Sequence, residues 1–228
     1  MSPNRSGSGD DAVKEQVKAY WDDRAETFDD DRHHGIHDEE QRQAWQSVLR
    51  TWTGEPPLQT LDVGCGSGVV SILLAELGHD VAGIDVSREM LERAREKSRS
   101  GGHSIEFRRG DAEALDAPDE TYDLVTGRHL IWTLPSPERA IREWRRVTRP
   151  GGRIVLVEGH WDFPEPFEGY EAIHDDLPLY DGRPPTELAA FLSEHGLEHV
   201  EYEPLNDAVL WGEKPDYEQY IVAGDVPR

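Results

Sequence analysis

A glycine-rich turn preceded by an acidic residue is the stretch of this sequence best suited to chemistry. It reads LDVGCGSGVV from Leu61, and its three glycines follow the spacing G-x-G-x-G: Gly64, Gly66 and Gly68. Glycines allow a backbone to approach a ligand closely and to adopt positive φ angles. The dinucleotide-binding fingerprint G-x-G-x-x-G would need its third glycine at Val69. Because the carboxylate of Asp62 would repel a pyrophosphate and attract a cation, the turn favours a ligand without phosphates.

Two further carboxylates follow the next two predicted strands. Asp85 ends the strand DVAGID, about 20 residues after the turn, where a carboxylate can accept hydrogen bonds from both hydroxyls of a ribose. Asp111, in GDAEAL, can accept a hydrogen bond from an adenine amino group, with the backbone N–H of Ala112 beside the ring. Together with Asp62, these acids describe a ligand with an adenine, a ribose and a cationic tail. That is the chemistry of S-adenosylmethionine (SAM).

The elements that must position these residues alternate in type along the chain. Two helices are expected first, over residues 11–28 and 38–52, where apolar residues recur at helical spacing. The strands expected after them are 59–63, 80–85, 104–111, 121–127, 153–159, 197–205 and 216–225, and the helices are 67–77, 87–100, 137–149 and 186–196. This alternation predicts an α/β fold whose parallel sheet carries helices on both faces. The carboxyl ends of its strands are the expected place for a ligand.

Several segments resemble the motifs of class I SAM-dependent methyltransferases. LDVGCGSG is similar to the first motif of that family, GIDVSREML to the second and GDAEAL to the third. YDLVTGRHLIWTL and REWRRVTRPGGRIVLVEG are similar to the region that follows, so the resemblance covers residues 60–160. The upstream YWDDRAETFD is similar to the small-molecule branch, which includes ubiquinone and menaquinone methyltransferases.

The resemblance implies both a fold and an activity. The fold would be a Rossmann-like, seven-stranded, mostly parallel sheet with helices on both faces, an antiparallel last strand and additional N-terminal helices. The activity would be transfer of a methyl group from SAM to a small-molecule acceptor, which leaves S-adenosylhomocysteine (SAH) as the product.

One set of residues is expected to bind the cofactor. Its members are Tyr20, Arg24, Asp62, Gly64, Cys65, Gly66, Gly68, Asp85, Val86, Asp111, Ala112 and Arg128. The resemblance implies that the glycines and Arg128 lie at the methionine end, that Asp85 binds the ribose and that Asp111 binds the adenine. Cys65 is expected chiefly to pack within the turn, and Asp62 could alternatively cap it.

The methyl acceptor is expected near the ends of the fourth and fifth strands. In-line transfer from a sulfonium requires an acceptor that is close, aligned and dry, and a base only when the acceptor is a poor nucleophile. His129, in GRHLIWTL, is the expected general base, with a packed histidine as the alternative. The residues expected to bind the acceptor are Trp132, Glu158, Trp161 and His34. Trp132 could equally belong to the core, and Glu158 is a second, weaker base candidate.

A histidine cluster and an aromatic segment complete the candidates. The segment DDDRHHGIHDEE contains His33, His34 and His37, but nothing distant completes a ligand set, so no metal is expected. This segment is predicted to gate the substrate or to be solvated. Residues 160–185 are long and aromatic, so they are expected to form a lid over the substrate, with a homodimer patch as the alternative.

The 228 residues suit one domain. The expected organisation is a flexible leader (1–10) followed by a single methyltransferase domain (11–228). Its parts are an N-terminal helical cap (11–56), a SAM-binding core (57–159), the substrate lid (160–185) and a C-terminal helix with strands (186–228).

The net charge of the chain limits which classes of partner it can bind. It carries 47 acidic against 24 basic residues, a net charge of −23, spread along the whole sequence. Such an acid-rich, lysine-poor surface resembles that of proteins from salt-loving microbes, and it disfavours nucleic acid as a partner. With a single cysteine, no apolar stretch of membrane-spanning length and no secretion signal, the sequence predicts a cytoplasmic protein that does not insert into membranes.

Three other functions compete with this interpretation. An NAD-dependent oxidoreductase is disfavoured by Val69 at the third glycine position and by the carboxylate of Asp62. A non-catalytic SAM-binding protein would keep the fold and lack the reaction. An RNA or protein methyltransferase is disfavoured by the negative charge.

Overall fold

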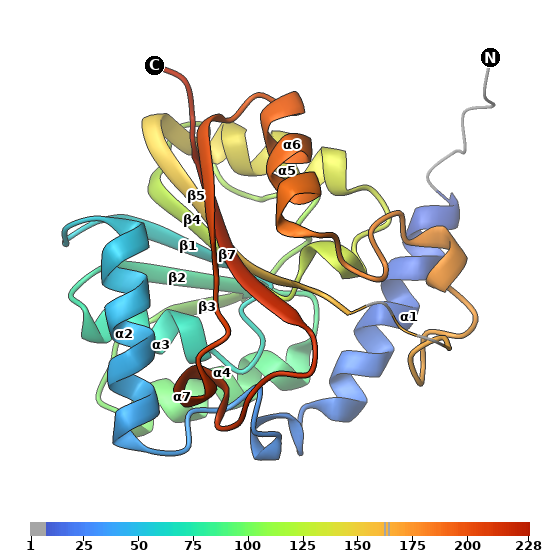
Figure 1. Cartoon of the computed structure of the whole chain (residues 1–228), viewed down its shortest axis with the longest axis horizontal. Coiled ribbons are helices and arrows are strands. Elements are labelled where there is room, and N and C mark those ends of the chain that lie inside the picture. Colours follow the sequence, from blue (N-terminus) through green and yellow to red (C-terminus); the bar gives the residue numbers. More distant parts are fainter. Residues whose placement is uncertain (1–7, 162, 164) are drawn as a thin grey trace.

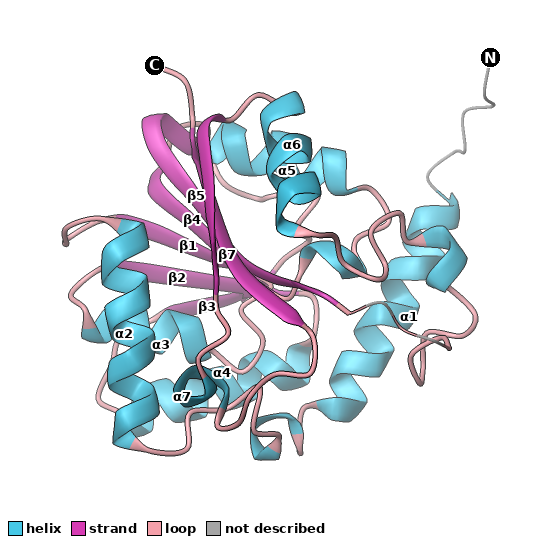
Figure 2. Cartoon of the chain, in the orientation of Figure 1, coloured by secondary structure: helices cyan, strands magenta, loops and turns pink. Residues whose placement is uncertain are grey.

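The chain folds around one seven-stranded sheet (Figures 1 and 2). The computed structural model describes residues 8–161, 163 and 165–228. The strands are β1 (Gln59–Val63), β2 (Asp80–Asp85), β3 (Glu106–Arg109), β4 (Tyr122–Arg128), β5 (Thr148–His160), β6 (Glu198–Pro204) and β7 (Glu218–Asp225). Their order is β3-β2-β1-β4-β5-β7-β6, parallel from β3 to β5, with β7 antiparallel to both of its neighbours. The predicted Rossmann-like sheet with an antiparallel last strand is confirmed.

Helices cover both faces of the sheet, as predicted. They are α1 (Ser8–Arg24), α2 (Glu39–Thr53), α3 (Val69–Glu76), α4 (Arg88–Ser100), α5 (Pro137–Val147), α6 (Pro185–Glu194) and α7 (Ala208–Trp211). One core lies between the sheet and α2, α3 and α7, around Trp45 and Leu73. The other lies between the sheet and α5 and α6, around Trp144 and Leu192. Both cores bury large apolar side chains, which is the main stabilising term for such a layered fold.

The strand order places a ligand site at one edge of the sheet. On one side of β1 the sheet continues with β2 and β3. On its other side it continues with β4 and β5, so the chain order reverses between β1 and β4. Ligands of open α/β sheets bind beyond the carboxyl ends of the strands at such a switch point. In Figure 1, α1 lies at the right of the molecule, beside the segment that follows β5. Aromatic and aliphatic side chains of these two segments share a small core that includes Val17 and Tyr170.

Some element boundaries differ from the sequence expectation for local reasons. The helix after the glycine turn begins at Val69 because Gly68 precedes it in the left-handed conformation, with φ +83°. Strand β5 begins at Thr148 rather than 153, and its pairing with β4 is irregular near that end. Ser136 does not cap α5, since its hydroxyl donates instead to Asp10 at 3.0 Å.

Two helices differ from expectation at the ends of the chain. Helix α1 already begins at Ser8, inside the segment expected to be a flexible leader, and residues 1–7 of that leader lie outside the described residues. The four-residue helix α7 was not predicted. It is too short to show a helical period, and it is held by burial of Leu210 and Trp211 against α2.

Candidate active site

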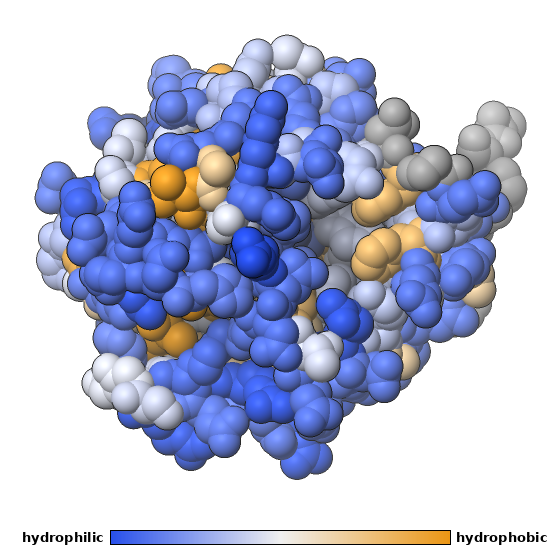
Figure 3. Space-filling view, turned by 60° about the horizontal axis from the view of Figure 1, so that its bottom comes forward, coloured by the Kyte–Doolittle hydropathy of each residue, from blue (hydrophilic) through white to orange (hydrophobic). Residues whose placement is uncertain are grey.

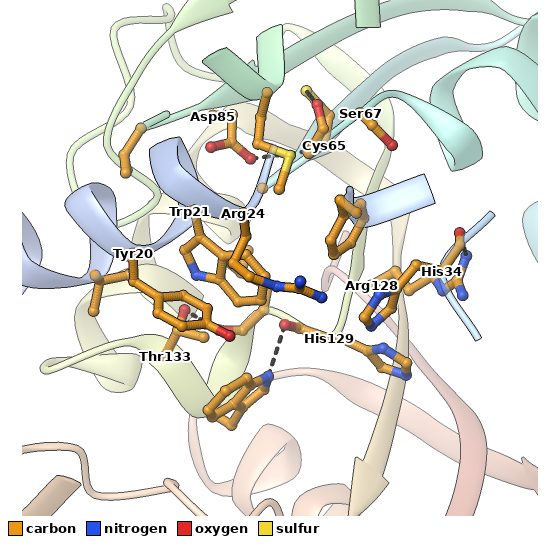
Figure 4. Close-up of a pocket in the computed structure, with 18 of the residues that line it drawn as sticks. Tyr20, Trp21, Arg24, His34, Cys65, Ser67, Asp85, Arg128, His129 and Thr133 are labelled. Carbon is orange, nitrogen blue, oxygen red and sulfur yellow. Dashed lines mark hydrogen bonds between the residues drawn. The ribbon is translucent and has the colours of Figure 1, made fainter. Parts of the chain in front are cut away.

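A cavity of about 930 Å³ lies at this edge of the sheet. Sites for small molecules span roughly 300–1,000 Å³, so this one is large enough for a cofactor and an acceptor together. Figure 3 shows hydrophobic side chains, in orange, beside a hollow on a face that is otherwise mostly hydrophilic. The residues predicted from the sequence that line the cavity are Tyr20, Arg24, His34, Asp62, Gly64, Cys65, Gly66, Asp85, Val86, Asp111, Ala112, Arg128, His129, Trp132 and Trp161. Figure 4 shows ten of the lining residues, labelled, around this space.

The glycine turn connects β1 to α3 and is held from beneath by β2. Gly64 and Gly66 have φ angles of +63° and +52°, which β-carbon-bearing residues rarely adopt. The N–H of Cys65 donates to the carbonyl of Ile84 at 2.9 Å. The Cys65 thiol is buried, and burial raises its pKa well above the ordinary value, so this cysteine packs within the turn and is not a thiolate.

Gly68 was predicted to bind the cofactor, but it does not line the cavity. A β-carbon there would lie 3.0 Å from the β-carbon of Ala94 and 3.2 Å from the ring of Phe107. Gly68 therefore allows the start of α3 to pack closely against α4 and β3.

Asp62 lies at the floor of the cavity, where β1 meets the turn. Its carboxylate accepts hydrogen bonds from the hydroxyls of Ser71 and Thr126, the latter at 3.1 Å. Burial raises its pKa to about 6, which the two hydrogen bonds partly oppose. The carboxylate is thus fixed in place and can still face a cation.

Asp85 ends β2 and joins two turns. One carboxylate oxygen accepts from the N–H of Gly66 and the other from the N–H of Ser87, each at 2.8 Å. Burial raises its pKa to about 6, against the effect of these two hydrogen bonds. Each carboxylate oxygen has two lone pairs, so both retain capacity to accept a hydroxyl from a ligand.

Asp111 follows β3 and is paired with a residue that the sequence analysis missed. The ammonium of Lys14, on α1, lies 2.8 Å from Asp111 and 2.6 Å from the buried Glu113. The other oxygen of Asp111 accepts from the backbone N–H of Glu113 at 2.9 Å. Burial lowers the pKa of Lys14, but its hydrogen bonds to the two carboxylates outweigh this effect and raise the pKa overall.

The N-terminal segment is fastened over the cavity at two more points. Asp22, on α1, accepts from the hydroxyl of Ser87 at 2.7 Å. Asp29, after α1, accepts from the hydroxyl of Ser67 at 2.5 Å and from the ammonium of Lys97 at 2.7 Å. These charged contacts join segments far apart in the sequence, so local spacing carries no signal for them.

Arg128, at the end of β4, is half-buried beside aromatic rings. Its guanidinium lies 4.9 Å from the ring centre of Trp45 and 5.3 Å from that of Trp211. It donates to the backbone carbonyls of His33 and His34. Burial lowers its pKa to about 10, so the guanidinium stays charged at neutral pH. Arg128 thus holds the histidine segment by its backbone and places a positive charge beside the cavity.

The predicted histidine cluster presents rings that are not arranged as metal ligands. The ring of His34 stacks on Phe28, with centres 4.2 Å apart. Burial lowers its pKa to about 4, so the ring is neutral near pH 7. Within the described ranges, no group of three or more histidine, cysteine, aspartate or glutamate side chains could hold a metal ion.

His129 lies in an unusual turn directly after β4. Its φ angle is +52°, and its ring stacks on Trp211 with the planes 10° apart. The ring atom Nε2 lies 3.0 Å from Oε1 of Gln219, a partner on β7 that the sequence analysis did not identify. Burial lowers the pKa of His129 well below its usual value, so the ring is neutral at physiological pH. A neutral imidazole can accept a proton, as the predicted base must, but this one would hold it weakly.

Aromatic rings form the wall opposite the cofactor turn. The ring centres of Trp132 and Trp161 lie 5.4 Å apart, and both side chains line the cavity. Phe163 and Phe167 extend this wall, which places part of the predicted lid at the cavity. Residues 162 and 164 of that predicted lid lie outside the described residues. Trp132 is 5% exposed, so it is both a wall residue and part of the local core.

Glu158 was predicted to bind the acceptor, but it is not brought to the cavity. Its side chain lies beneath the turn after β4, is 1% exposed and does not line the cavity. One oxygen accepts from the backbone N–H groups of Leu130 and Ile131, each at 3.0 Å. Glu158 does lie near the carboxyl end of β5, where ligand-binding residues are expected, but its side chain points under the turn after β4.

The fold and the site together define an α/β protein with a ligand-sized cavity at the switch point of its sheet. Residues 61–156 match the family model described as a methyltransferase domain. The ubiquinone biosynthesis O-methyltransferase of Aliivibrio fischeri is 30% identical over 189 residues, which cover 77% of this chain and 80% of that protein. The chain belongs to the class I SAM-dependent methyltransferases.

Two further similarities have different extents. The phosphatidylethanolamine N-methyltransferase of Cereibacter sphaeroides is 46% identical over 101 residues, which cover 43% of this chain and about half, 49%, of that protein. A solved phosphoethanolamine N-methyltransferase 2 of Haemonchus contortus with SAH has a TM-score of 0.71 at 15% identity, over 95% of this chain and 60% of that one. This second likeness shows the fold.

The predicted family, enzyme class and cofactor are therefore confirmed: the chain is a methyltransferase that uses SAM. No helix in the described part of the chain is both long and apolar enough to cross a membrane.

Proposed function

We propose that this enzyme transfers the methyl group of SAM to a small-molecule acceptor held against its aromatic wall. The observation that carries the proposal is a single cavity with two chemically different ends. One end has the glycine turn and the carboxylates of Asp62, Asp85 and Asp111. The other has the rings of Trp132 and Trp161.

The cofactor end supports one orientation of SAM. Asp85 would accept hydrogen bonds from the ribose and Asp111 from the adenine, because these carboxylates follow β2 and β3 in order across the sheet. The methionine end would then lie over Gly64 and Gly66, with Asp62 facing the ammonium group and Arg128 facing the carboxylate. Tyr20 and Arg24, on α1, would cover the cofactor from the other side (Figure 4).

The acceptor end supports a flat or apolar substrate. Aromatic faces give large contact area and favour offset or edge-on contact with other rings. In the reaction, a lone pair of the acceptor forms a bond to the methyl carbon while the carbon–sulfur bond breaks, and neutral SAH leaves. If the acceptor carries a proton, His129 is placed to accept it. One relative is named as an O-methyltransferase and another as an N-methyltransferase, so these names leave the acceptor atom open.

A matched pair of variants tests the cofactor end. Asp85→Asn should weaken SAM binding at least tenfold, since an amide presents only one acceptor oxygen. Asp80→Asn is the control, because Asp80 lies exposed at the opposite end of the same strand. Calorimetric titration of both variants with SAM, at molar potassium chloride, gives the comparison. Equal affinities for the two variants would refute the assignment of Asp85.

The acceptor end is tested by transfer of labelled methyl from SAM into small-molecule extracts, with mass detection of the product. The wild-type enzyme should label a metabolite, and Trp132→Leu should lose most of that labelling while SAM affinity stays within about threefold. Labelling that is unchanged in Trp132→Leu would refute the aromatic wall as the acceptor site. Saturable SAM binding with no labelled product from any extract would contradict the proposed small-molecule reaction.

A further inference from the structure

The turn between β4 and the 3-10 helix Ile131–Thr133 is supported by a buried carboxylate. A single oxygen of Glu158, at the end of β5, accepts the backbone N–H groups of both Leu130 and Ile131 at 3.0 Å. These N–H groups stand at the start of the short helix, where no intrahelical acceptor is available. Glu158 therefore supplies the acceptor that this turn lacks.

The same turn is in a conformation that needs support. His129 has a φ angle of +52°, a left-handed conformation that is unfavourable for a residue with a β-carbon. Its N–H donates to the carbonyl of Val157 at 2.8 Å, the residue directly before Glu158. Its carbonyl accepts the indole N–H of Trp132, also at 2.8 Å. Consecutive residues of β5 thus hold consecutive residues of the turn.

This turn reaches both ends of the cavity. His129 and Trp132 line the proposed acceptor site, whereas Leu130 packs against the glycine turn. A β-carbon added to Gly64 would lie 2.6 Å from Cδ1 of Leu130, which shows how closely the two turns approach. A shift of the 129–132 backbone would therefore move the acceptor wall and also change the packing beneath the cofactor.

We propose that Glu158 is a positioning residue for methyl transfer, which fixes the 129–132 turn through its two backbone hydrogen bonds. It is not the general base, because its side chain is 1% exposed and does not line the cavity. Its function requires an oxygen at the right reach and does not require a negative charge. The inference uses the position of the acceptor wall from the proposed function, but its test needs only SAH.

Variants at position 158 distinguish the effect of side-chain length, which sets how far the oxygen reaches, from the effect of the negative charge. Glu158→Gln keeps an oxygen at the same reach and removes the charge, whereas Glu158→Asp keeps the charge and shortens the reach by one methylene. Glu158→Ala removes both. Glu143→Ala is the matched control: Glu143 also accepts a backbone N–H, that of Leu115 at 3.0 Å, but lies away from the cavity.

Two measurements on the whole 228-residue chain report the position of the 129–132 turn, and neither needs a methyl acceptor. One is the NMR resonance of the Trp132 indole N–H, assigned by its loss in Trp132→Phe. The other is the dissociation constant for SAH. Glu158→Gln should keep the wild-type resonance and bind SAH within twofold of wild type. Glu158→Asp and Glu158→Ala should shift the resonance and weaken SAH binding at least fivefold, while Glu143→Ala changes neither.

The opposite pattern would overturn the proposal. If Glu158→Asp behaves as wild type and Glu158→Gln as Glu158→Ala, the charge matters and the reach does not. An indole resonance that is unchanged in both Glu158→Asp and Glu158→Ala would also contradict it. Should Glu158→Ala fail to fold, Glu158→Asp and Glu158→Gln still decide between the two outcomes. A wild-type protein that binds no SAH would instead contradict the proposed cofactor site.

Discussion

Substitution of Gly64 by alanine should damage both the stability and the cofactor site of this enzyme. Gly64 has a φ angle of +63°, and it lines the cavity directly after β1. An added β-carbon would lie 2.6 Å from Cδ1 and 3.0 Å from Cδ2 of Leu130, closer than van der Waals contact allows. The atoms it meets are the end of a flexible side chain, so Leu130 must rotate away.

The expected loss of stability follows from two terms. A left-handed backbone costs a residue with a β-carbon about 1–2 kcal/mol. Displacing Leu130 from its preferred rotamer adds roughly 1 kcal/mol. The sum, roughly 2–3 kcal/mol, should lower the melting temperature of a chain of this size by roughly 4–12 °C. Because the displaced Leu130 also shifts the packing beneath the turn, SAM affinity should fall at least tenfold.

Gly102 provides the matched control for this prediction. It has a φ angle of +76°, and a β-carbon there would meet no atom within 4 Å. Gly102→Ala should therefore cost only the backbone term and leave SAM affinity unchanged. Thermal unfolding and calorimetric titration of both variants measure the two effects. The reasoning is refuted if Gly64→Ala is no less stable than Gly102→Ala and binds SAM as tightly as wild type.

Three further predictions concern titratable groups at or near the site. Lys14→Met should weaken SAM binding severalfold in low salt, because Asp111 and Glu113 lose their shared cation. The difference in affinity from wild type should shrink in molar potassium chloride, which screens charges. A difference that does not depend on salt would contradict an electrostatic role. Burial raises the pKa of Glu158 to about 8, so the native state holds a proton that the unfolded state releases, and the free energy of unfolding should fall by at most about 1.4 kcal/mol per pH unit from about pH 4.5 to 8. Denaturant titrations should show a smaller fall in Glu158→Gln, and an identical slope would be evidence against the raised pKa. The half-buried His129 has a lowered pKa, so stability should be lost as pH decreases below about 6.5, and His129→Gln should reduce that loss in the same titrations. Equal acid sensitivity of the two proteins would count against a neutral ring.

Much of the fold could be predicted because its signals are local. Alternation of strand and helix patterns from residue 59 onward predicts the parallel sheet, and every expected strand is observed, although β3 is shorter and β5 longer than expected. The start of α4 also has a local signal, because serine is a favoured capping residue and the hydroxyl of Ser87 accepts the N–H of Met90 at 3.1 Å. The short helix α7 has a capping residue, Asp207, but four residues are too few to show a helical period, and hydrogen bonds from Gln41 and Trp45 of α2 to the carbonyl of Leu210 help to hold it.

The candidate site could be predicted where residues directly follow strands. Asp62, Asp85, Asp111 and His129 all lie at the cavity because parallel strands end at one edge of the sheet. Their roles toward SAM and the acceptor remain predictions. The rule places a residue near the edge but does not determine where its side chain points, so the side chain of Glu158 lies under the turn after β4 and not at the cavity.

The partners of these residues could not be predicted from spacing. Lys14 and Asp111 are 97 positions apart, and His129 and Gln219 are 90 apart. Lys14 reaches Asp111 from α1, and Gln219 reaches His129 because β7 pairs with β5. A pattern within a single window of sequence cannot report such contacts, because tertiary packing creates them.

The interior position of β7 has a consequence for the synthesis of this protein. Strand β7 follows β5 and β6 in the chain but lies between them in the sheet, and it brings Gln219 to His129. A nascent chain that has not yet released β7 therefore has two unpaired strand edges, which are prone to associate with other chains. The site should become complete only after β7 has been synthesised, so fragments truncated before residue 218 should aggregate and lack activity even though they contain the whole glycine turn.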